Sequence, residues 1–275
     1  MSNWVPLKFD LMAKKVFGNE NDTRPIRFLL KQILDIEVDK VKILNNEIIG
    51  NPYLDKKYSV DLIVEIEDKR IVVEINTNVT SKIIDRNLFY MARIMSRDIG
   101  KGEDYSKLHR HIQINFDFKG HHERPIERYK LISGNSILTD KIEIIRIDVP
   151  YFYRICYNED ASTKEKFIGL FNEENKIKAK KLIVGNKDME EIYEKMDEYN
   201  EDIIGLYDVE ARRKFEEESV IEEAREIGLK EGKEEGLKEG LKEATKNMLK
   251  ENMNINLISK VTGLSIEEIN ELKSN

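Results

Sequence analysis

The chain has 275 residues, of which 40% are hydrophobic and 36% charged, and 53 acidic against 46 basic residues give a net charge of −7. This length can hold one large domain or two. No apolar run approaches the roughly 18 residues of a membrane span, so we expect a cytoplasmic protein without a membrane partner. The single cysteine, Cys156, excludes an intramolecular disulfide framework. The acidic balance excludes a protein that coats nucleic acid through bulk charge.

The first hundred residues predict a helix, a short strand, a hairpin and a second helix. Apolar residues recur at helical spacing over 24–36 and again over 80–97. A weak alternation over 41–44 predicts a short strand. Two runs rich in Val and Ile, 58–66 and 70–75, are separated by the turn 67–69 and predict a hairpin.

Two further strands and a helical region follow. Residues 111–118 alternate Ile112, Ile114, Phe116 and Phe118, which predicts a strand with one buried face, and residues 142–149 predict another strand that ends at Pro150. The order of these elements indicates a mixed α/β sheet. Residues 151–207 read as helices that pack on that sheet. A long charged helix is predicted from residue 209, followed by two short helices within 254–273.

Two acidic residues interrupt the apolar strands of the predicted hairpin. A turn near residue 68 places Asp61 almost opposite Glu74, and Asn76 lies on the same side of its strand as Glu74. Two carboxylates on adjacent strands can share a hard divalent cation, completed by the Ile75 carbonyl and water. The alternative is a pair of solvated surface acids, although an unpaired carboxylate inside an apolar strand is costly.

In this pattern the sequence resembles the recombination-promoting nuclease (Rpn) transposase group of the PD-(D/E)XK nuclease superfamily. The resemblance implies a restriction-endonuclease-like α/β core of the order αβββαβ with a helical C-terminal extension. We therefore expect a nuclease core over 1–150, a helical region packing on it over 151–208, and an oligomerisation region over 209–275. The resemblance is carried by Asp61 with 74–76, by the segments 9–18 and 86–93, by 102–105 with the strand that runs to Phe118, and by the Gly-rich tail that ends in 262–264.

The resemblance also implies roles for individual residues. Asp61, Glu74 and the Ile75 carbonyl are expected to bind Mg²⁺ or Mn²⁺. Such a cation can activate a water for phosphodiester hydrolysis. The third motif position is Lys in the superfamily and commonly Gln in the Rpn group, but it is Asn76 here. Asn76 can orient the nucleophile or a phosphate, but it cannot supply the positive charge of Lys.

Other side chains are candidates for that charge and for auxiliary roles. Arg86 is expected to assist catalysis from the helix after the hairpin, and Lys82 is an auxiliary candidate that reads equally well as part of a basic outer face. Asp10 is a second auxiliary candidate, or else the N-cap of the helix that follows it. The predicted activity is that of a metal-dependent DNA endonuclease involved in recombination, mobile elements or defence against foreign DNA. The alternative is a catalytically weak or inactive nuclease-like scaffold for DNA binding or assembly.

The four histidines fall within a short segment and raise the question of a zinc site. They are not accompanied by cysteine and do not recur at helical spacing, so a strand entry and a polar loop are favoured over zinc. The residues are His109, His111, His121 and His122.

Small residues recur every four positions in the predicted long helix. Each Gly in a helix costs roughly 1 kcal/mol relative to Ala, and close approach of another helix would offset that loss, by analogy with small-residue packing in membranes. We therefore expect a homo-oligomer formed through 209–275, with a flexible charged tether as the alternative. The repeat consists of Ala224, Gly228, Gly232, Gly236, Gly240 and Ala244.

Overall fold

A computed structural model describes residues 4–44, 47–48, 58–119 and 122–274. The chain forms two compact units, residues 1–208 and residues 209–275. The long helix α7 (Lys187–Lys250) contributes residues to both units. Among the described residues, none of the helices combines the length and the apolarity that crossing a membrane requires.

The first unit contains a six-stranded mixed sheet in the order β1-β4-β5-β6-β8-β7. Strands β1 (Lys42–Leu44), β4 (Leu62–Ile66) and β5 (Lys69–Asn76) are antiparallel neighbours. Strand β6 (Arg110–Asp117) runs parallel to β5 and to β8 (Ser136–Asp148), and β7 (Ile126–Ser133) forms an antiparallel hairpin with β8. A separate pairing joins β2 (Glu47–Ile48) to β3 (Tyr58–Ser59).

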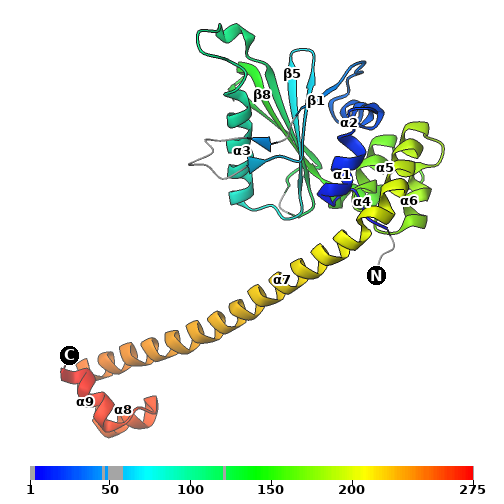
Figure 1. Ribbon diagram of the computed structural model, residues 1–275. Coiled ribbons are helices and arrows are strands. Elements are labelled where there is room, and N and C mark those ends of the chain that lie inside the picture. Colours follow the sequence, from blue (N-terminus) through cyan, green and yellow to red (C-terminus); the bar gives the residue numbers. More distant parts are fainter. Residues whose placement is uncertain (1–3, 45–46, 49–57, 120–121, 275) are drawn as a thin grey trace. The chain divides into compact units, whose positions relative to one another are not determined.

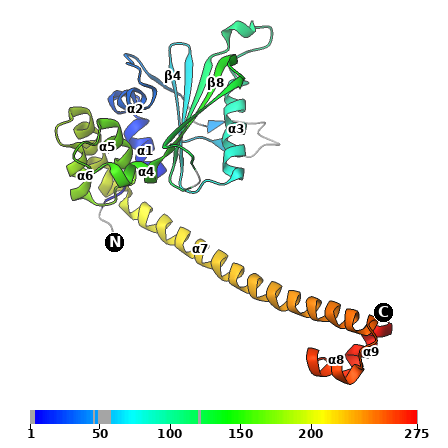
Figure 2. The same ribbon diagram turned by 180° about the vertical axis from the view of Figure 1, so that it is seen from behind.

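Helices cover both faces of this sheet (Figures 1 and 2). Helix α3 (Ser81–Met95) connects the parallel strands β5 and β6 and lies on one face. The opposite face is covered by α1 (Asp10–Phe17), α2 (Arg24–Leu34), α4 (Val149–Ile155), α5 (Thr163–Leu170) and α6 (Lys176–Ile183). A 3₁₀ turn, η1 (Tyr105–Lys107), precedes β6. The helices and strands confirm the predicted α/β fold class and its αβββαβ order.

The main hydrophobic core lies under the second group of helices. Phe171 stacks on Phe116 of β6 with ring centroids 4.2 Å apart, and on Phe17 of α1 at 5.8 Å. Phe171 at the end of α5 thus packs on both the sheet and α1. Burying aromatic rings of this size removes a large apolar area from water, which makes this stack a major source of stability for the unit.

The N-terminal segment is fixed against the first turns of α7. Trp4 stacks on Tyr193 with ring centroids 5.0 Å apart, and Phe9 meets Tyr207 edge to face at 5.3 Å. The backbone N–H of Val5 donates to the side-chain oxygen of Asn200 at 2.8 Å. The two ends of this unit are thus part of one packed structure.

Three expectations about the strands are corrected. The predicted strand over 58–66 divides into β3 and β4, so Asp61 lies in the bend just before β4. Strand β6 is buried on both faces, because α3 covers the polar face that was expected to meet water. Strand β8 begins at Ser136 and ends at Asp148, and its partner β7 was not predicted.

The second unit ends in a pair of short helices, α8 (Ile255–Thr262) and α9 (Ile266–Ser274). Gly263 separates them with a positive φ of 74°, a backbone conformation that favours glycine. The N–H of Glu268 donates to the Ser265 hydroxyl at 3.2 Å, and the N–H of Ser265 donates to the Glu268 carboxylate at 2.8 Å. These reciprocal hydrogen bonds form a capping box at the start of α9.

Candidate active site

The register of the β4–β5 hairpin brings two carboxylates together. Leu62 pairs with Val73, so Asp61, which precedes Leu62, lies opposite Glu74, which follows Val73, as predicted. The carboxylate of Asp61 accepts a hydrogen bond from the backbone N–H of Ile75 at 2.8 Å. The end of β5 thereby fixes Asp61 beside Glu74.

Glu74 is a buried carboxyl with an unused oxygen. Its residue is 3% exposed, and it lies with Val72 and Asn76 on the face of β5 toward α3. Within the described residues its Oε1 atom has no hydrogen-bond partner. Burial, followed by the charge of Asp61, raises the pKa of Glu74 to about 8. Burial also raises the pKa of Asp61, although a neighbouring lysine opposes that shift.

Arg86 reaches the acidic pair from α3, as predicted. Its guanidinium lies 3.8 Å from Glu74 Oε2 and donates to the side-chain oxygen of Asn76 at 3.4 Å. The guanidinium also lies over the ring of Tyr90, 5.6 Å from the centroid. Lys82 is exposed in the first turn of the same helix, and the structure does not bring it into contact with the acids among the residues that it describes.

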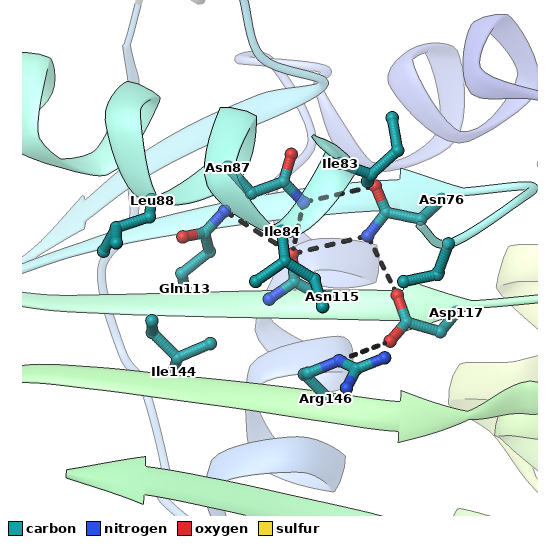
Figure 3. A pocket seen from close by; sticks show the side chains of 11 residues that line it. Asn76, Ile83, Ile84, Asn87, Leu88, Gln113, Asn115, Asp117, Ile144 and Arg146 are labelled. Carbon is teal, nitrogen blue, oxygen red and sulfur yellow. Dashed lines mark hydrogen bonds and ion pairs between the residues drawn. The ribbon is translucent and has the colours of Figure 1, made fainter. Parts of the chain in front are cut away.

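Asn76 is held in a network of buried amides (Figure 3). Its nitrogen donates to Asp117 at 2.9 Å, and its oxygen accepts from Asn87 of α3 at 3.2 Å. Asn87 also donates to Asn115 at 2.9 Å, and Arg146 donates to Asp117 at 2.9 Å. The amide of Asn76 is therefore engaged on both sides and joins β5, β6 and α3.

A cavity of about 70 Å³ lies beside this network. Its polar side is formed by the amides and by Asp117 with Arg146, and its apolar side by Ile83, Ile84 and Leu88 of α3 (Figure 3). These polar residues are not among the site residues predicted from the sequence. In the sequence, Gln113, Asn115 and Asp117 alternate with the apolar residues Ile112, Ile114 and Phe116, and this alternation marks a polar face of the strand.

A lysine that the sequence analysis also overlooked lies against Asp61. The Nζ atom of Lys14 is 3.2 Å from Asp61 Oδ1 and 3.4 Å from Asp10 Oδ2. Asp10 stands in the first turn of α1, where its side chain also accepts from the N–H of Leu11 at 2.8 Å. Asp10 thus contacts the site through Lys14. The four-residue spacing of Asp10 and Lys14 on one helix is the sequence feature that indicates this ion pair.

The chemistry of these donors fits a hard divalent cation. Asp61 and Glu74 supply two carboxylates, and one oxygen of Glu74 is buried and has no hydrogen-bond partner among the residues that the structure describes. The Ile75 carbonyl is directed to the same side of β5 as the N–H that binds Asp61, because both groups of one residue face the same neighbouring strand. Over the described ranges no group of three His, Cys, Asp or Glu side chains could hold a metal ion, so backbone oxygen and water would complete the coordination.

The three histidines that the structure describes contact acidic residues at two different places. His109 and His111 both contact Asp98, at 3.1 Å and 2.7 Å, whereas His122 lies 3.4 Å from Asp117 and 3.2 Å from Glu127. His121 lies outside the described residues.

The chain is similar to a known protein family over most of its length. Residues 7–224 match the family described as PD-(D/E)XK nuclease family transposase. The chain belongs to this family of nuclease-like transposases. Comparisons with curated proteins and with solved structures found no match. The resemblance noted in the sequence is thereby confirmed, and so is a nuclease-type function at the level of the family.

The family match covers the whole sheet and the first part of α7. It includes both acids and Asn76, and it ends at residue 224, before the first glycine of the repeat at Gly228. The nuclease-like transposase region therefore extends well beyond Pro150. The helical residues 151–208 belong to the matched region as well as to the first compact unit.

Proposed function

We propose that this nuclease-like transposase is a metal-dependent DNA endonuclease that hydrolyses phosphodiester bonds. The observation that carries the proposal is the pair of carboxyls at the ends of adjacent strands, one fixed by the Ile75 N–H and the other buried with an unpaired oxygen. Recombination, mobile elements and defence against foreign DNA are the biological settings in which such an activity is used by the family it resembles.

Each residue of the proposed site has a part in this reaction. Asp61 and Glu74 would hold Mg²⁺ or Mn²⁺ together with the Ile75 carbonyl. When bound, the cation supplies Lewis-acid charge and lowers the pKa of water. Arg86, 3.8 Å from Glu74, is placed to stabilise negative charge that develops on the phosphate. Asn76 positions Arg86 and the end of β5 through its two amide contacts.

Conservative substitutions of the two acids test the proposal. Asp61→Asn and Glu74→Gln remove the charge but keep the size of the side chain, so Mg²⁺-dependent cleavage of double-stranded DNA should fall by at least about 10²-fold. Asp68→Asn, in the exposed turn of the same hairpin, is the matched control and should cleave as the wild type does. Thermal unfolding of all four proteins verifies that they fold. Wild-type cleavage rates in both active-site variants would contradict the assignment.

A second candidate function follows from Asn76. Its amide is neutral and 4% exposed, and it is engaged with Asp117 and Asn87, so the usual lysine of the motif has no direct replacement at this position. This observation favours a scaffold that binds DNA but cleaves it weakly or not at all. A plasmid-nicking assay with Mg²⁺, Mn²⁺ or EDTA separates the two functions, because only the endonuclease nicks DNA when metal is present.

We also propose that residues 209–275 assemble copies of the chain. An added Cβ atom at Gly228, Gly232, Gly236 or Gly240 would meet nothing within 4 Å, and Leu229 and Leu237 beside them are 59% and 73% exposed. This surface can accept another helix at close range. The double variant Gly232→Gln with Gly236→Gln favours the helix but blocks close approach, so it should sediment as a smaller species than the wild type. Equal sedimentation coefficients for the two proteins would count against assembly through this helix.

A further inference from the structure

The proposed site lacks a positive charge at its third motif position. Asn76 is neutral, and both ends of its amide are engaged with Asp117 and Asn87. Arg86 partly compensates, since it lies 3.8 Å from Glu74. The carboxylate of Asp61 forms an ion pair with a lysine of a different helix, because Nζ of Lys14 on α1 lies 3.2 Å from its Oδ1 atom.

We propose that Lys14 supplies the missing charge of the active site. Without metal, its ammonium neutralises Asp61; when a divalent cation binds Asp61 and Glu74, the ammonium is released to bind a non-bridging oxygen of the DNA phosphate. The inference rests on the proposed nuclease function, and it assigns Lys14 as a residue that contacts the substrate.

The position of Lys14 on α1 supports this assignment. The neighbouring side chains Met12, Ala13, Val16 and Phe17 are buried, so the backbone of the helix is fixed against the core. The Lys14 side chain itself is 30% exposed, which leaves its flexible stem and three N–H donors room to change partner. Helix α1 and helix α3 lie on opposite faces of the sheet (Figures 1 and 2). Lys14 and Arg86 therefore approach the acidic pair from opposite faces.

The contacts of Lys14 predict competition with metal. Its ammonium lies between the carboxylates of Asp10 and Asp61, at 3.4 Å and 3.2 Å. A divalent cation on Asp61 has to displace or repel this ammonium, so removal of Lys14 should strengthen metal binding. A lysine that merely held Asp61 in place would act in the opposite direction, since its loss would free Asp61 and weaken metal binding.

The experiment compares full-length wild type with Lys14→Met, Lys14→Arg and Lys15→Met. Lys15 is the matched control, because it is the next residue on α1 and its ammonium lies over the ring of Tyr199, 5.2 Å from the centroid. Calorimetric titration with Mn²⁺ alone measures metal binding. Fluorescence anisotropy with double-stranded DNA in Ca²⁺ measures substrate binding without relying on cleavage, and a Mg²⁺ assay then measures the cleavage rate.

The expected pattern has opposite signs in the two binding experiments. Lys14→Met should bind Mn²⁺ about tenfold more tightly, and it should bind DNA in Ca²⁺ about tenfold more weakly because one charge-assisted phosphate contact is lost. Its cleavage rate should fall on the order of 10²-fold. Lys14→Arg should bind DNA as the wild type does, and Lys15→Met should match the wild type in all three experiments.

Several results would overturn the proposal. Weaker or unchanged Mn²⁺ binding by Lys14→Met would show that Lys14 only holds Asp61 in position. Absence of Mn²⁺ binding in both proteins would show that Lys14 does not compete with a metal ion for Asp61. Wild-type cleavage by Lys14→Met would also refute it. If the wild type itself cleaves no DNA, the nuclease proposal fails, whereas the Mn²⁺ and Ca²⁺–DNA comparisons still decide the role of Lys14. Thermal unfolding of each variant shows whether the comparison is between folded proteins.

Discussion

Glu74 should make the stability of the metal-free protein depend on pH. Its pKa is raised from the ordinary 4.5 to about 8, chiefly by burial and next by the charge of Asp61. The folded protein therefore holds a proton that the unfolded chain releases at lower pH. The stabilising contribution is fully present below pH 4.5 and is lost as the pH rises through about 8. The substitution that tests this reasoning is Glu74→Gln, which is neutral at every pH and nearly the same size.

The difference between the two pKa values corresponds to a free energy of unfolding of at most about 5 kcal/mol. For a protein of this size, that amounts to a shift in Tm on the order of 10 °C. In EDTA, the Tm of the wild type should fall relative to that of Glu74→Gln between pH 5.5 and pH 8.5. Added Mg²⁺ should reverse this loss for the wild type at the higher pH, because a bound cation stabilises the ionised carboxylate.

Calorimetric scans of the two proteins over this pH range measure the effect directly. Groups remote from Glu74 titrate alike in both proteins, so their contributions cancel in the difference between the two Tm curves, which reports on Glu74 together with the neighbouring Asp61. Parallel curves in EDTA would refute the reasoning, because they would show that Glu74 is ionised in the folded protein at no extra cost. A stabilisation of Glu74→Gln by Mg²⁺ as large as that of the wild type would refute the metal assignment of Glu74.

Two further substitutions test the structure around the site. Asn76→Ala should lower the free energy of unfolding by about 2–4 kcal/mol, because it leaves Asp117 and Asn87 with unsatisfied buried groups. Urea unfolding measures this loss, and a loss below about 1 kcal/mol would contradict the hydrogen-bond network. Phe171→Ala should lower the free energy of unfolding by about 3–5 kcal/mol in the same assay, because the ring stacks between Phe17 and Phe116. A loss below about 0.5 kcal/mol, as is usual for a surface residue, would show that the ring does not belong to the core.

The pairing of the two acids could be predicted because it depends on counting along one hairpin. Once the turn is placed near Asp68, the register follows, and a strand of Val and Ile that contains Glu74 shows that this acid is unusual. The helices were found for a similar reason. Their apolar residues repeat at helical spacing, and Phe167, Leu170 and Phe171 mark the face that packs on the sheet.

The remaining parts of the site depend on contacts between distant segments. Lys14 and Asp61 are separated by α2, β1 and the segment after it, and no local pattern links them. The polar face of β6 could be read as a solvent face, because Gln113, Asn115 and Asp117 alternate with apolar residues as in a half-exposed strand. Only the covering helix α3 makes that face buried. Strand β7 escaped prediction because most of its residues are exposed, so its apolar pattern is weak.

The packing of Trp4 on Tyr193 and of Val5 on Asn200 has a consequence for how the protein is made. During synthesis the N-terminal segment can make its native contacts only after residues near 200 have been translated. The ring contacts of Phe17 and of Phe9, which flank α1, likewise require Phe171 and Tyr207. Domains fold as units while the ribosome adds about 5–20 residues per second. The proposed site, with Lys14 against Asp61, is therefore expected to assemble only after nearly the whole first unit, residues 1–208, has been translated.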